Sequence, residues 1–318
     1  MPRVVFLIAE RVELFDLAGP LQVFHEANVL GADYRTLFAA ASRSLASEQG
    51  VTLANLRRLP RIGRDDLVVV PGSRALREAG RRRAPDQAEL VAWIREAHQR
   101  GATIASVCVG AFLLGRAGLL DGRQCTTHWR HVEELRQRFP RAHVLADRLY
   151  VHDGSIVTSA GIASGVDMAL ALVEAHAGPR VAAAVAREMV VHVRRPGGDA
   201  QLNAFLSHRD HLDSAVHHVQ DWMINHPSDR LTLDELAGVA LLSRRHLSRT
   251  FRAATGLSIA QYHLRIRLEH ARSLLLNRAL TVEAIAQRCG LSDARHLRRA
   301  WKAAFGTSPA DGRRAPSS

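Results

Sequence analysis

Residues 102–114 read Ala-Thr-Ile-Ala-Ser-Val-Cys-Val-Gly-Ala-Phe-Leu-Leu. The first six residues form a short, mostly apolar run that is rich in β-branched side chains, which is typical of a buried strand. The residues from Val109 onward begin a helix, so Cys108 lies at the turn between strand and helix. A strand that leads directly into a helix is the repeating unit of α/β folds.

The same alternation extends to both sides of this stretch. Apolar runs such as residues 67–70 suit the interior of a parallel sheet covered by helices on both faces. Residues 153–154, Asp-Gly, are a turn signal between two of the runs. We predict strands at residues 4–9, 34–41, 67–70, 103–108, 142–145, 149–152 and 155–158, and helices near 17–30, 85–99, from 110, 162–177 and 180–192.

A charged, Pro/Gly-rich stretch, Arg-Arg-Pro-Gly-Gly-Asp at residues 194–199, interrupts this pattern. We therefore place a linker at residues 194–212, between an α/β domain at 1–193 and a second domain at 213–318. The second domain contains helix-like patterns and turn signals but no strand pattern, which predicts an all-α fold.

Length and composition agree with two soluble domains, since the chain has 318 residues, of which 47% are hydrophobic and 23% charged. The longest stretch without a charged residue, 101–115, is shorter than the ~20 apolar residues of a membrane-spanning helix. No signal-like leader precedes the first strand, so we expect a cytoplasmic protein without a membrane partner. The three cysteines show no paired spacing, and the histidines form no metal motif. We predict no metal and no cofactor.

The chain is strongly basic, with 43 Lys and Arg against 31 Asp and Glu, and Lys302 is its only lysine. Residues 212–318 hold 16 basic and 9 acidic residues, whereas residues 1–211 hold 27 and 22. Arginine suits phosphates and base edges, but an arginine-rich surface also arises without a nucleic-acid partner. The charge alone leaves both interpretations open.

The C-terminal domain contains a near repeat. Its first copy holds Leu236-Ala237, Leu242-Ser243, Leu247, Phe251 and Gly256, and its second copy holds Ile285-Ala286, Leu291-Ser292, Leu297, Trp301 and Gly306. The offset is 49 residues up to the serine and 50 beyond it. Each copy predicts a helix, a short turn and a second helix that is capped by Ser243 in one copy and by Ser292 or Asp293 in the other.

The second helix of each copy has one apolar face and one basic face. Leu247 with Phe251, and Leu297 with Trp301, are i,i+4 pairs that we expect to be buried. Two solvated helices in an ordinary bundle would also give such faces, but the repeat favours helix-turn-helix recognition of the major groove. The outward basic residues are Arg244, Arg245, Arg249 and Arg252, with Ser248, and Arg295, His296, Arg298, Arg299 and Lys302.

At these residues the chain resembles the AraC/XylS family of transcription regulators over about residues 215–311. The match includes residues 233–237, 243–251, 256–258, 265–276 as a linking helix, 282–286, 289–292 and 305–309. Gly312 departs from it, since the family usually has an aromatic residue there. The resemblance implies that DNA is faced by Arg245, Ser248 and Arg249 from one unit and by Ala294, Arg295, His296, Arg298 and Arg299 from the other.

In the first domain, Cys108 has two interpretations. At the N-terminus of a helix its thiolate would be favoured, which is typical of a reactive cysteine. A free cysteine is also commonly a small buried apolar residue. Position alone does not decide between them.

Residues 3–190 resemble the ThiJ/PfpI superfamily, which has the class I glutamine amidotransferase-like, flavodoxin-like fold. The matching motifs are residues 16–20, 70–73, 106–111, 117–122, 126–129 and 158–161. The resemblance implies an elbow cysteine, Cys108, that faces Asp16 with His128 close by. It also implies that the N–H groups of Gly72 and Val109 shape an anion pocket, with Ser73 among the ligand-binding residues.

Catalysis is one use of such a site, with Cys108, Asp16 and His128 as candidate catalytic residues. However, Val109 stands where protease-like members have a histidine and hydratase-like members a threonine, and its side chain cannot transfer a proton. The site can instead recognise a small ligand, such as an amine or amino-acid derivative. His128 has a further interpretation, as a core histidine packed on Trp129.

The domain order resembles the GlxA-type subgroup of AraC-family regulators. It implies a sequence-specific regulator that binds double-stranded DNA in the major groove, senses a small-molecule effector, forms a homodimer and contacts RNA polymerase. The alternatives are a cysteine-dependent hydratase or amidase fused to a DNA-binding domain, and a first domain that only dimerises. The sequence does not identify the effector or the operator.

Overall fold

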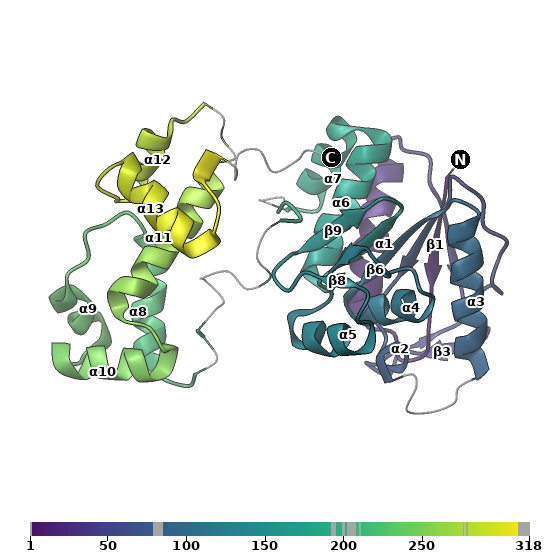
Figure 1. Cartoon of the computed structure of the whole chain (residues 1–318), viewed down its shortest axis with the longest axis horizontal. Coiled ribbons are helices and arrows are strands. Elements are labelled where there is room, and N and C mark those ends of the chain that lie inside the picture. The colour runs from purple at the N-terminus through teal and green to yellow at the C-terminus, as the bar shows by residue number, and fades with distance from the viewer. Residues whose placement is uncertain are drawn as a thin grey trace. The chain divides into compact units, whose positions relative to one another are not determined.

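A computed structural model of the chain describes residues 2–78, 85–191, 195–198, 201, 208–209, 211–275, 277 and 279–310. The chain divides into two compact units, Met1–Gln201 and Leu202–Ser318 (Figure 1). Part of the predicted linker at 194–212, and Gly312, lie outside the described residues. Among the helices that are described, none is long and apolar enough to cross a membrane.

The first unit is built on a six-stranded sheet of order β2-β1-β5-β6-β10-β9, in which only the β9–β10 pair is antiparallel. Its strands are β1 (Arg3–Leu7), β2 (Arg35–Ala39), β5 (Leu67–Val70), β6 (Thr103–Val107), β9 (Tyr150–Asp153) and β10 (Ile156–Ser159). Two small pairs lie outside this sheet, β3 (Leu45–Ala46) with β4 (Thr52–Leu53) and β7 (Gln124–Cys125) with β8 (His143–Val144). The predicted, mostly parallel α/β fold is confirmed.

Helices cover both faces of the sheet because alternate residues of each strand point to opposite sides. In β1, Val5 and Leu7 pack into one core with α2–α5, while Val4 and Phe6 pack into the other with α1, α6 and α7. The first group is α2 (Arg74–Glu78), α3 (Pro85–Gln99), α4 (Ala111–Arg116) and α5 (Val132–Arg138), and the second is α1 (Leu14–Val29), α6 (Ala163–Ala177) and α7 (Pro179–Glu188). Short 3₁₀ turns, η1 (Cys108–Gly110) and η2 (Trp129–His131), precede α4 and α5.

Most predicted elements of the first unit are present, with ends that shift by a few residues. The helix predicted over 180–192 is shorter, because α7 ends at Glu188 and Val190 has a φ of 56°, which does not continue a helix. The two-residue strands and α2 and α5 were not predicted, since so few residues carry no readable periodicity.

The described part of the second unit is helical, as predicted. Its elements are α8 (Ser214–Asn225), α9 (Leu233–Ala240), α10 (Arg244–Thr255), α11 (Ile259–Leu275), α12 (Val282–Arg288) and α13 (Ala294–Phe305). Two separate cores hold it together, one around α8–α10 and one around α12 and α13. Helix α11 joins them, since Tyr262 and Ile266 lie in the first core and Leu268, Ala271 and Leu275 in the second. It begins six residues before the predicted linking helix at 265–276.

Candidate DNA-binding face and effector site

Helices α10 and α13 each have an N-cap side chain that bonds to the first turn of the helix. The Ser243 hydroxyl accepts a hydrogen bond of 3.3 Å from the His246 N–H, and Asp293 Oδ1 accepts one of 2.7 Å from the His296 N–H. Of the two predicted caps in the second copy, Asp293 is therefore the one that is used. The extra residue in the second copy is the turn residue Ser292, which accounts for the change of offset from 49 to 50.

Each of these helices buries one face and exposes the other. Leu247 and Phe251 of α10 are fully buried, and Phe251 packs edge-to-face on Tyr262 of α11 at 5.5 Å. Leu297 and Trp301 are the buried pair of α13. The exposed residues are Arg244, Arg245, Ser248, Arg249 and Arg252 on α10 and Arg295, Arg298, Arg299 and Lys302 on α13, while His296 is half-buried.

Ala294 departs from the other residues of the predicted DNA-facing set, because its side chain is only 8% exposed. It is the first residue of α13, and its N–H donates to Glu283 Oε2 at 3.1 Å. This backbone hydrogen bond ties the start of α13 to α12, and the Ala294 side chain is buried.

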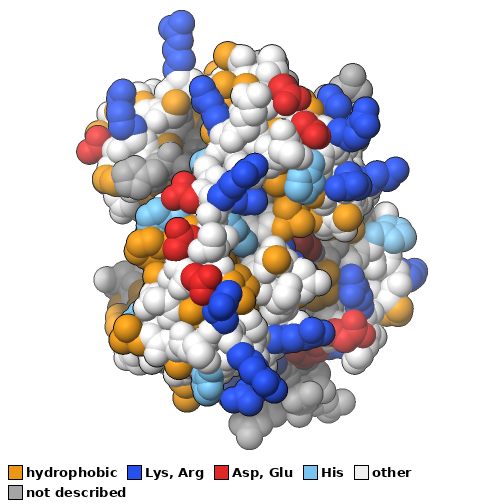
Figure 2. Space-filling view, turned by 90° about the vertical axis from the view of Figure 1, so that its left-hand side faces the viewer, with side chains coloured by type: hydrophobic (Ala, Val, Ile, Leu, Met, Phe, Trp, Pro, Cys, Tyr) orange, Lys and Arg blue, Asp and Glu red, His pale blue; other side chains and the backbone are white. Residues whose placement is uncertain are grey.

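The face of α10 borders a groove of about 820 Å³ that is lined by basic and apolar residues. Arg245, Ser248, Arg249 and Arg252 line it from α10. Arg244 is different, since its guanidinium pairs with Asp234 at 3.1 Å. Lys and Arg side chains are also distributed over the face of the molecule that Figure 2 shows, between smaller hydrophobic areas. The four residues of α10 therefore present a contiguous cationic and polar edge that suits a polyanion.

In the first unit, Cys108 occupies the turn between β6 and α4 with a φ of 54°, which is unfavourable for a residue other than glycine. Gly110 permits this tight turn, since a Cβ there would lie 2.3 Å from the Val70 carbonyl oxygen. The Thr127 hydroxyl donates to the Cys108 carbonyl at 2.7 Å. The elbow is thus strained and fixed from two sides, as functional turns often are.

Asp16 lies beside Cys108, as the superfamily resemblance implied, and it is only 1% exposed. Its Oδ1 accepts a hydrogen bond of 2.7 Å from the Ile162 N–H, whereas Oδ2 is buried without a hydrogen-bond partner. A Cβ on Gly72 would lie 2.2 Å from Oδ2 and 3.2 Å from Cys108 Cβ, so Gly72 lies directly against both side chains. Burial raises the pKa of Asp16 to about 6, against the opposing effect of the Ile162 hydrogen bond.

The thiol of Cys108 behaves differently from the expectation of a favoured thiolate. Burial and the neighbouring Asp16 carboxylate raise its pKa above the ordinary value, and the Val109 N–H lowers it only in part. The 3₁₀ turn η1, which begins at Cys108, is short, so its N–H groups stabilise the thiolate less than burial destabilises it. The raised pKa therefore favours the neutral thiol of this half-buried cysteine.

The remaining predicted residues have other contacts. The Ser73 hydroxyl donates to the Glu10 carbonyl and accepts from the Leu76 N–H, so it holds the start of α2. The pKa of His128 is lowered, first by burial, and its ring lies 5.6 Å from that of Trp129. Its Nδ1 accepts from the Arg130 N–H at 3.4 Å. These contacts agree with the interpretation of His128 as a packed histidine, one residue away from Thr127.

Three residues at this site were not predicted. Ile162 has a φ of 49°, Gly161 lies close enough that a Cβ would be 2.6 Å from Cys108 Cβ, and Thr127 supports the elbow. Gly161 and Thr127 fall within motifs of the superfamily resemblance, but nothing in their residue types specifies a contact with Cys108. Ile162 gives no signal in sequence, because it acts through its backbone.

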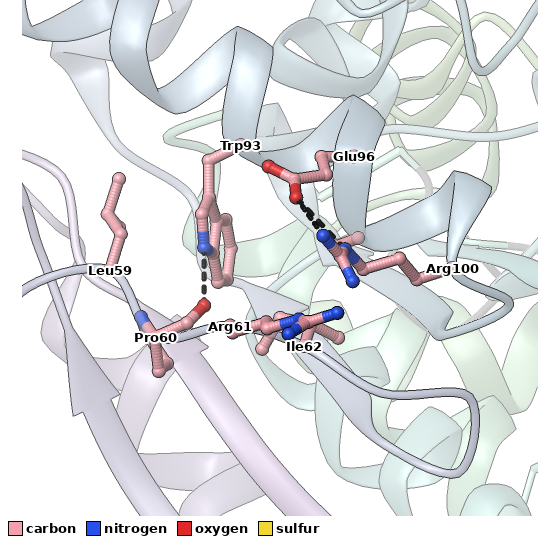
Figure 3. A pocket seen from close by; sticks show the side chains of 8 residues that line it. Leu59, Pro60, Arg61, Ile62, Trp93, Glu96 and Arg100 are labelled. Atoms are coloured by element: carbon pink, nitrogen blue, oxygen red, sulfur yellow. Dashed lines mark hydrogen bonds and ion pairs between the residues drawn. The ribbon is translucent and has the colours of Figure 1, made fainter.

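A separate cavity of about 480 Å³ lies between α3 and residues 59–62. Figure 3 shows two pairs among its polar groups, since Trp93 Nε1 donates to the Pro60 carbonyl at 2.8 Å and Arg100 pairs with Glu96 at 2.6 Å. None of the predicted site residues lines it.

Comparison with known proteins finds a separate family model for each of the two units. The DJ-1/PfpI family model matches residues 2–175, and a helix-turn-helix domain model matches residues 236–315. A solved structure, an AraC family transcriptional regulator from Pseudomonas putida, shares the fold over 59% of this chain and all of its own, with a TM-score of 0.53 and 23% identity.

Curated relatives span both units. The HTH-type transcriptional regulator CdhR of Pseudomonas aeruginosa is 29% identical over 97% of this chain and 90% of its own length, and GlxA of Rhizobium meliloti is 33% identical over 70% and 68%. Isonitrile hydratase of Pseudomonas putida is 30% identical over 53% of the chain and 69% of its own length. The chain belongs to the GlxA-type transcription regulators of the AraC/XylS family, in which a DJ-1/PfpI domain precedes a DNA-binding helix-turn-helix domain.

Proposed function

We propose that α10 and α13 are the two recognition helices of this regulator and enter successive major grooves on one side of the duplex. The observation that carries this proposal is the matched construction of the two helices. Each has a capped start, an apolar face in its own core and a cationic face in solvent. Helix α11, which has 17 residues and is therefore roughly 25 Å long, links the cores that hold them.

The test of DNA recognition is a salt-titrated binding assay of the full chain. The DNA comes from upstream of its own and neighbouring genes, with scrambled DNA of the same composition as the control. Specific affinity should exceed nonspecific affinity by ~10³ or more, and both should fall with salt as counterions are released. Equal affinity for both DNAs at every salt concentration contradicts the assignment.

We propose further that the first unit senses a small metabolite at Asp16 and Cys108. The buried Oδ2 of Asp16 supports this, since among the described residues only the Cys108 thiol and the Gly72 N–H lie beside it and neither makes a hydrogen bond of good geometry, so that a ligand donor would satisfy it. A negative charge with a missing donor favours an ammonium group. An amine or amino-acid derivative is therefore the ligand class that we propose.

A thermal-shift screen tests this ligand class. Amines and amino-acid derivatives are compared with uncharged analogues of the same shape, on the wild type and on Asp16→Asn. A ligand that binds only the folded state raises its stability, so a cationic ligand should stabilise the wild type and not the variant. A ligand that stabilises both proteins equally binds elsewhere.

The second candidate function is cysteine-dependent hydration or amide hydrolysis by the first unit. The observation that favours it is the strained elbow that holds Cys108 against a carboxylate, together with the similarity to isonitrile hydratase. The raised pKa of the thiol and the aliphatic Val109 oppose it. We propose that the first unit does not turn over substrate, and turnover that is lost in Cys108→Ser would overturn this.

We also propose that the regulator acts in the cytoplasm as a homodimer, contacts RNA polymerase, and joins its two domains through the linker at residues 194–212. Light scattering of the full chain tests the dimer. A monomer at all concentrations, with undiminished DNA binding, contradicts it.

A further inference from the structure

The segment that leads out of the first unit is anchored to that unit at three points. Arg195 pairs with the buried Asp167 carboxylate at 2.6 Å. The Gly197 carbonyl accepts a hydrogen bond of 3.0 Å from the Leu149 N–H. The third anchor is Gln201, which is the last residue of the first unit.

Gln201 is anchored by both its backbone and its side chain. Its N–H donates to Asp147 Oδ1 at 3.0 Å. Its side-chain Nε2 lies within hydrogen-bonding distance of three oxygens, Thr126 Oγ1 at 3.2 Å, Thr127 O at 2.9 Å and Ala146 O at 3.1 Å. Thr126 and Thr127 are both fully buried, so this amide reaches into the interior.

Thr127 is shared between Gln201 and the effector site. Its carbonyl accepts from Gln201, and its hydroxyl donates to the Cys108 carbonyl at 2.7 Å. Direct contacts therefore run from the elbow through Thr127 to Gln201, and the next residue, Leu202, begins the second unit. The Gln201 Oε1 atom is buried without a hydrogen-bond partner, which lowers the stability of this position of the side chain. A small displacement of its neighbours can therefore move Gln201 out of it.

We propose that Gln201 is a positioning residue that couples the effector site to the linker. A ligand that displaces the Cys108 carbonyl or Thr127 removes the Thr127 carbonyl as an acceptor and weakens the attachment of Gln201 to the first unit. The effect is a shift between a docked and a released Gln201, driven by the difference in ligand affinity for the two states. This inference rests on the proposed sensing function of the Cys108–Asp16 site.

The test uses a covalent occupant, methyl methanethiosulfonate, on the full chain. Because the pKa of this thiol is raised, the reaction is run at alkaline pH, where the Cys108 thiol loses its proton to the buffer; the thiolate then attacks the methylthio sulfur and methanesulfinate leaves, which places a methylthio group in the site. Cys108→Ser, which cannot form this adduct, is the control for its position. Amide hydrogen exchange of the peptides that contain Leu149 and Gln201 reports linker docking. In the wild type the adduct should accelerate this exchange about 5-fold or more.

Gln201→Ala and Gln201→Glu both remove the amide donor, and the second keeps the size of the side chain. Both should exchange rapidly without the adduct and respond to it less than about 2-fold. Gln99→Ala, at an exposed glutamine near the end of α3, is the matched control and should respond as the wild type does. The response to the adduct, and not the basal exchange rate, separates coupling from a purely structural role.

Two outcomes overturn the coupling: an adduct that leaves the exchange of the wild type unchanged, or Gln201 variants that respond as fully as the wild type. Sequence-specific DNA binding is measured on the same samples. Its absence from the unmodified wild type contradicts the proposed recognition helices and leaves the exchange result intact. An adduct that changes DNA affinity equally in the wild type and in Gln201→Ala also contradicts the coupling.

Discussion

The backbone N–H of Ile162 donates a hydrogen bond of 2.7 Å to Oδ1 of Asp16, which joins the start of α6 to α1 beside the cysteine elbow. Ile162 makes this contact with a φ of 49°, a conformation that costs roughly 1–2 kcal/mol for a residue other than glycine. The Asp16 carboxyl thus has a strained donor on one oxygen and no partner on the other. This arrangement costs stability, as strained groups at functional sites often do.

The pKa of Asp16 predicts how stability depends on pH. A carboxyl whose pKa rises from an ordinary 3.8 in the unfolded chain to about 6 in the folded protein binds more protons when folded, so its contribution to stability falls as pH rises between these values. This difference between the two pKa values corresponds to about 3 kcal/mol of unfolding free energy. Relative to the wild type, Asp16→Asn should therefore gain about 3 kcal/mol in unfolding free energy between pH 4 and pH 7.

Calorimetry of both proteins across this pH range, with the transition of the first unit resolved, measures the difference. Comparing the two proteins cancels the other titrating groups. A difference that does not change with pH, or that favours the wild type as pH rises, contradicts the raised pKa.

The turns of the two helix-turn-helix units provide a second prediction. Leu241 has a φ of 55° and is 91% exposed. Its left-handed conformation therefore lowers stability, and no packing of its side chain offsets this. Gly290 occupies the equivalent position 49 residues later, with a φ of 67°. Leu241→Gly should raise the unfolding free energy by about 0.5–1 kcal/mol, the strain relieved less the added chain entropy.

The converse substitution, Gly290→Ala, is the matched test. Its Cβ would lie 2.2 Å from the Ser228 carbonyl oxygen in a conformation that alanine avoids. We expect a loss of about 2 kcal/mol or more. Urea unfolding measures both variants, and an unchanged midpoint in both would show that these turns are not strained.

The sequence predicts the fold better than it predicts the effector site. Repetition and periodicity reveal the strands and the recognition helices, because burial of one face imposes a pattern on the residues. They do not reveal that Ala294 is buried at the start of α13, since alanine suits either face. They also do not reveal Gln201, whose role depends on loops 55 and 75 residues away.

The capping of α13 gives a third prediction. Asp293 caps the helix through a hydrogen bond from the His296 N–H, which helps to hold the pKa of Asp293 below its ordinary value, while Ser292 lies in the turn. Asp293→Ala should lower the melting temperature of the second unit, and Ser292→Ala should change it less. Because the folded-state pKa is depressed, the cap stabilises above the unfolded pKa and is lost as pH falls through the folded pKa. Equal effects of the two variants would show that the cap is shared.

The last prediction concerns base reading by Arg249 and Arg299, one exposed arginine from each recognition helix. If each grips a guanine edge with two hydrogen bonds, its replacement by alanine should cost about 1–3 kcal/mol on the specific site and relax the preference at one base pair. A phosphate contact gives a different result, since it weakens all sequences alike and reduces the salt slope by about 1. Arg100→Ala, at the residue that follows α3 in the first unit, removes the same charge and should leave DNA affinity unchanged. Comparing the variants on specific and scrambled DNA over a salt series separates the two roles, and unchanged affinity in both helix variants contradicts the recognition face.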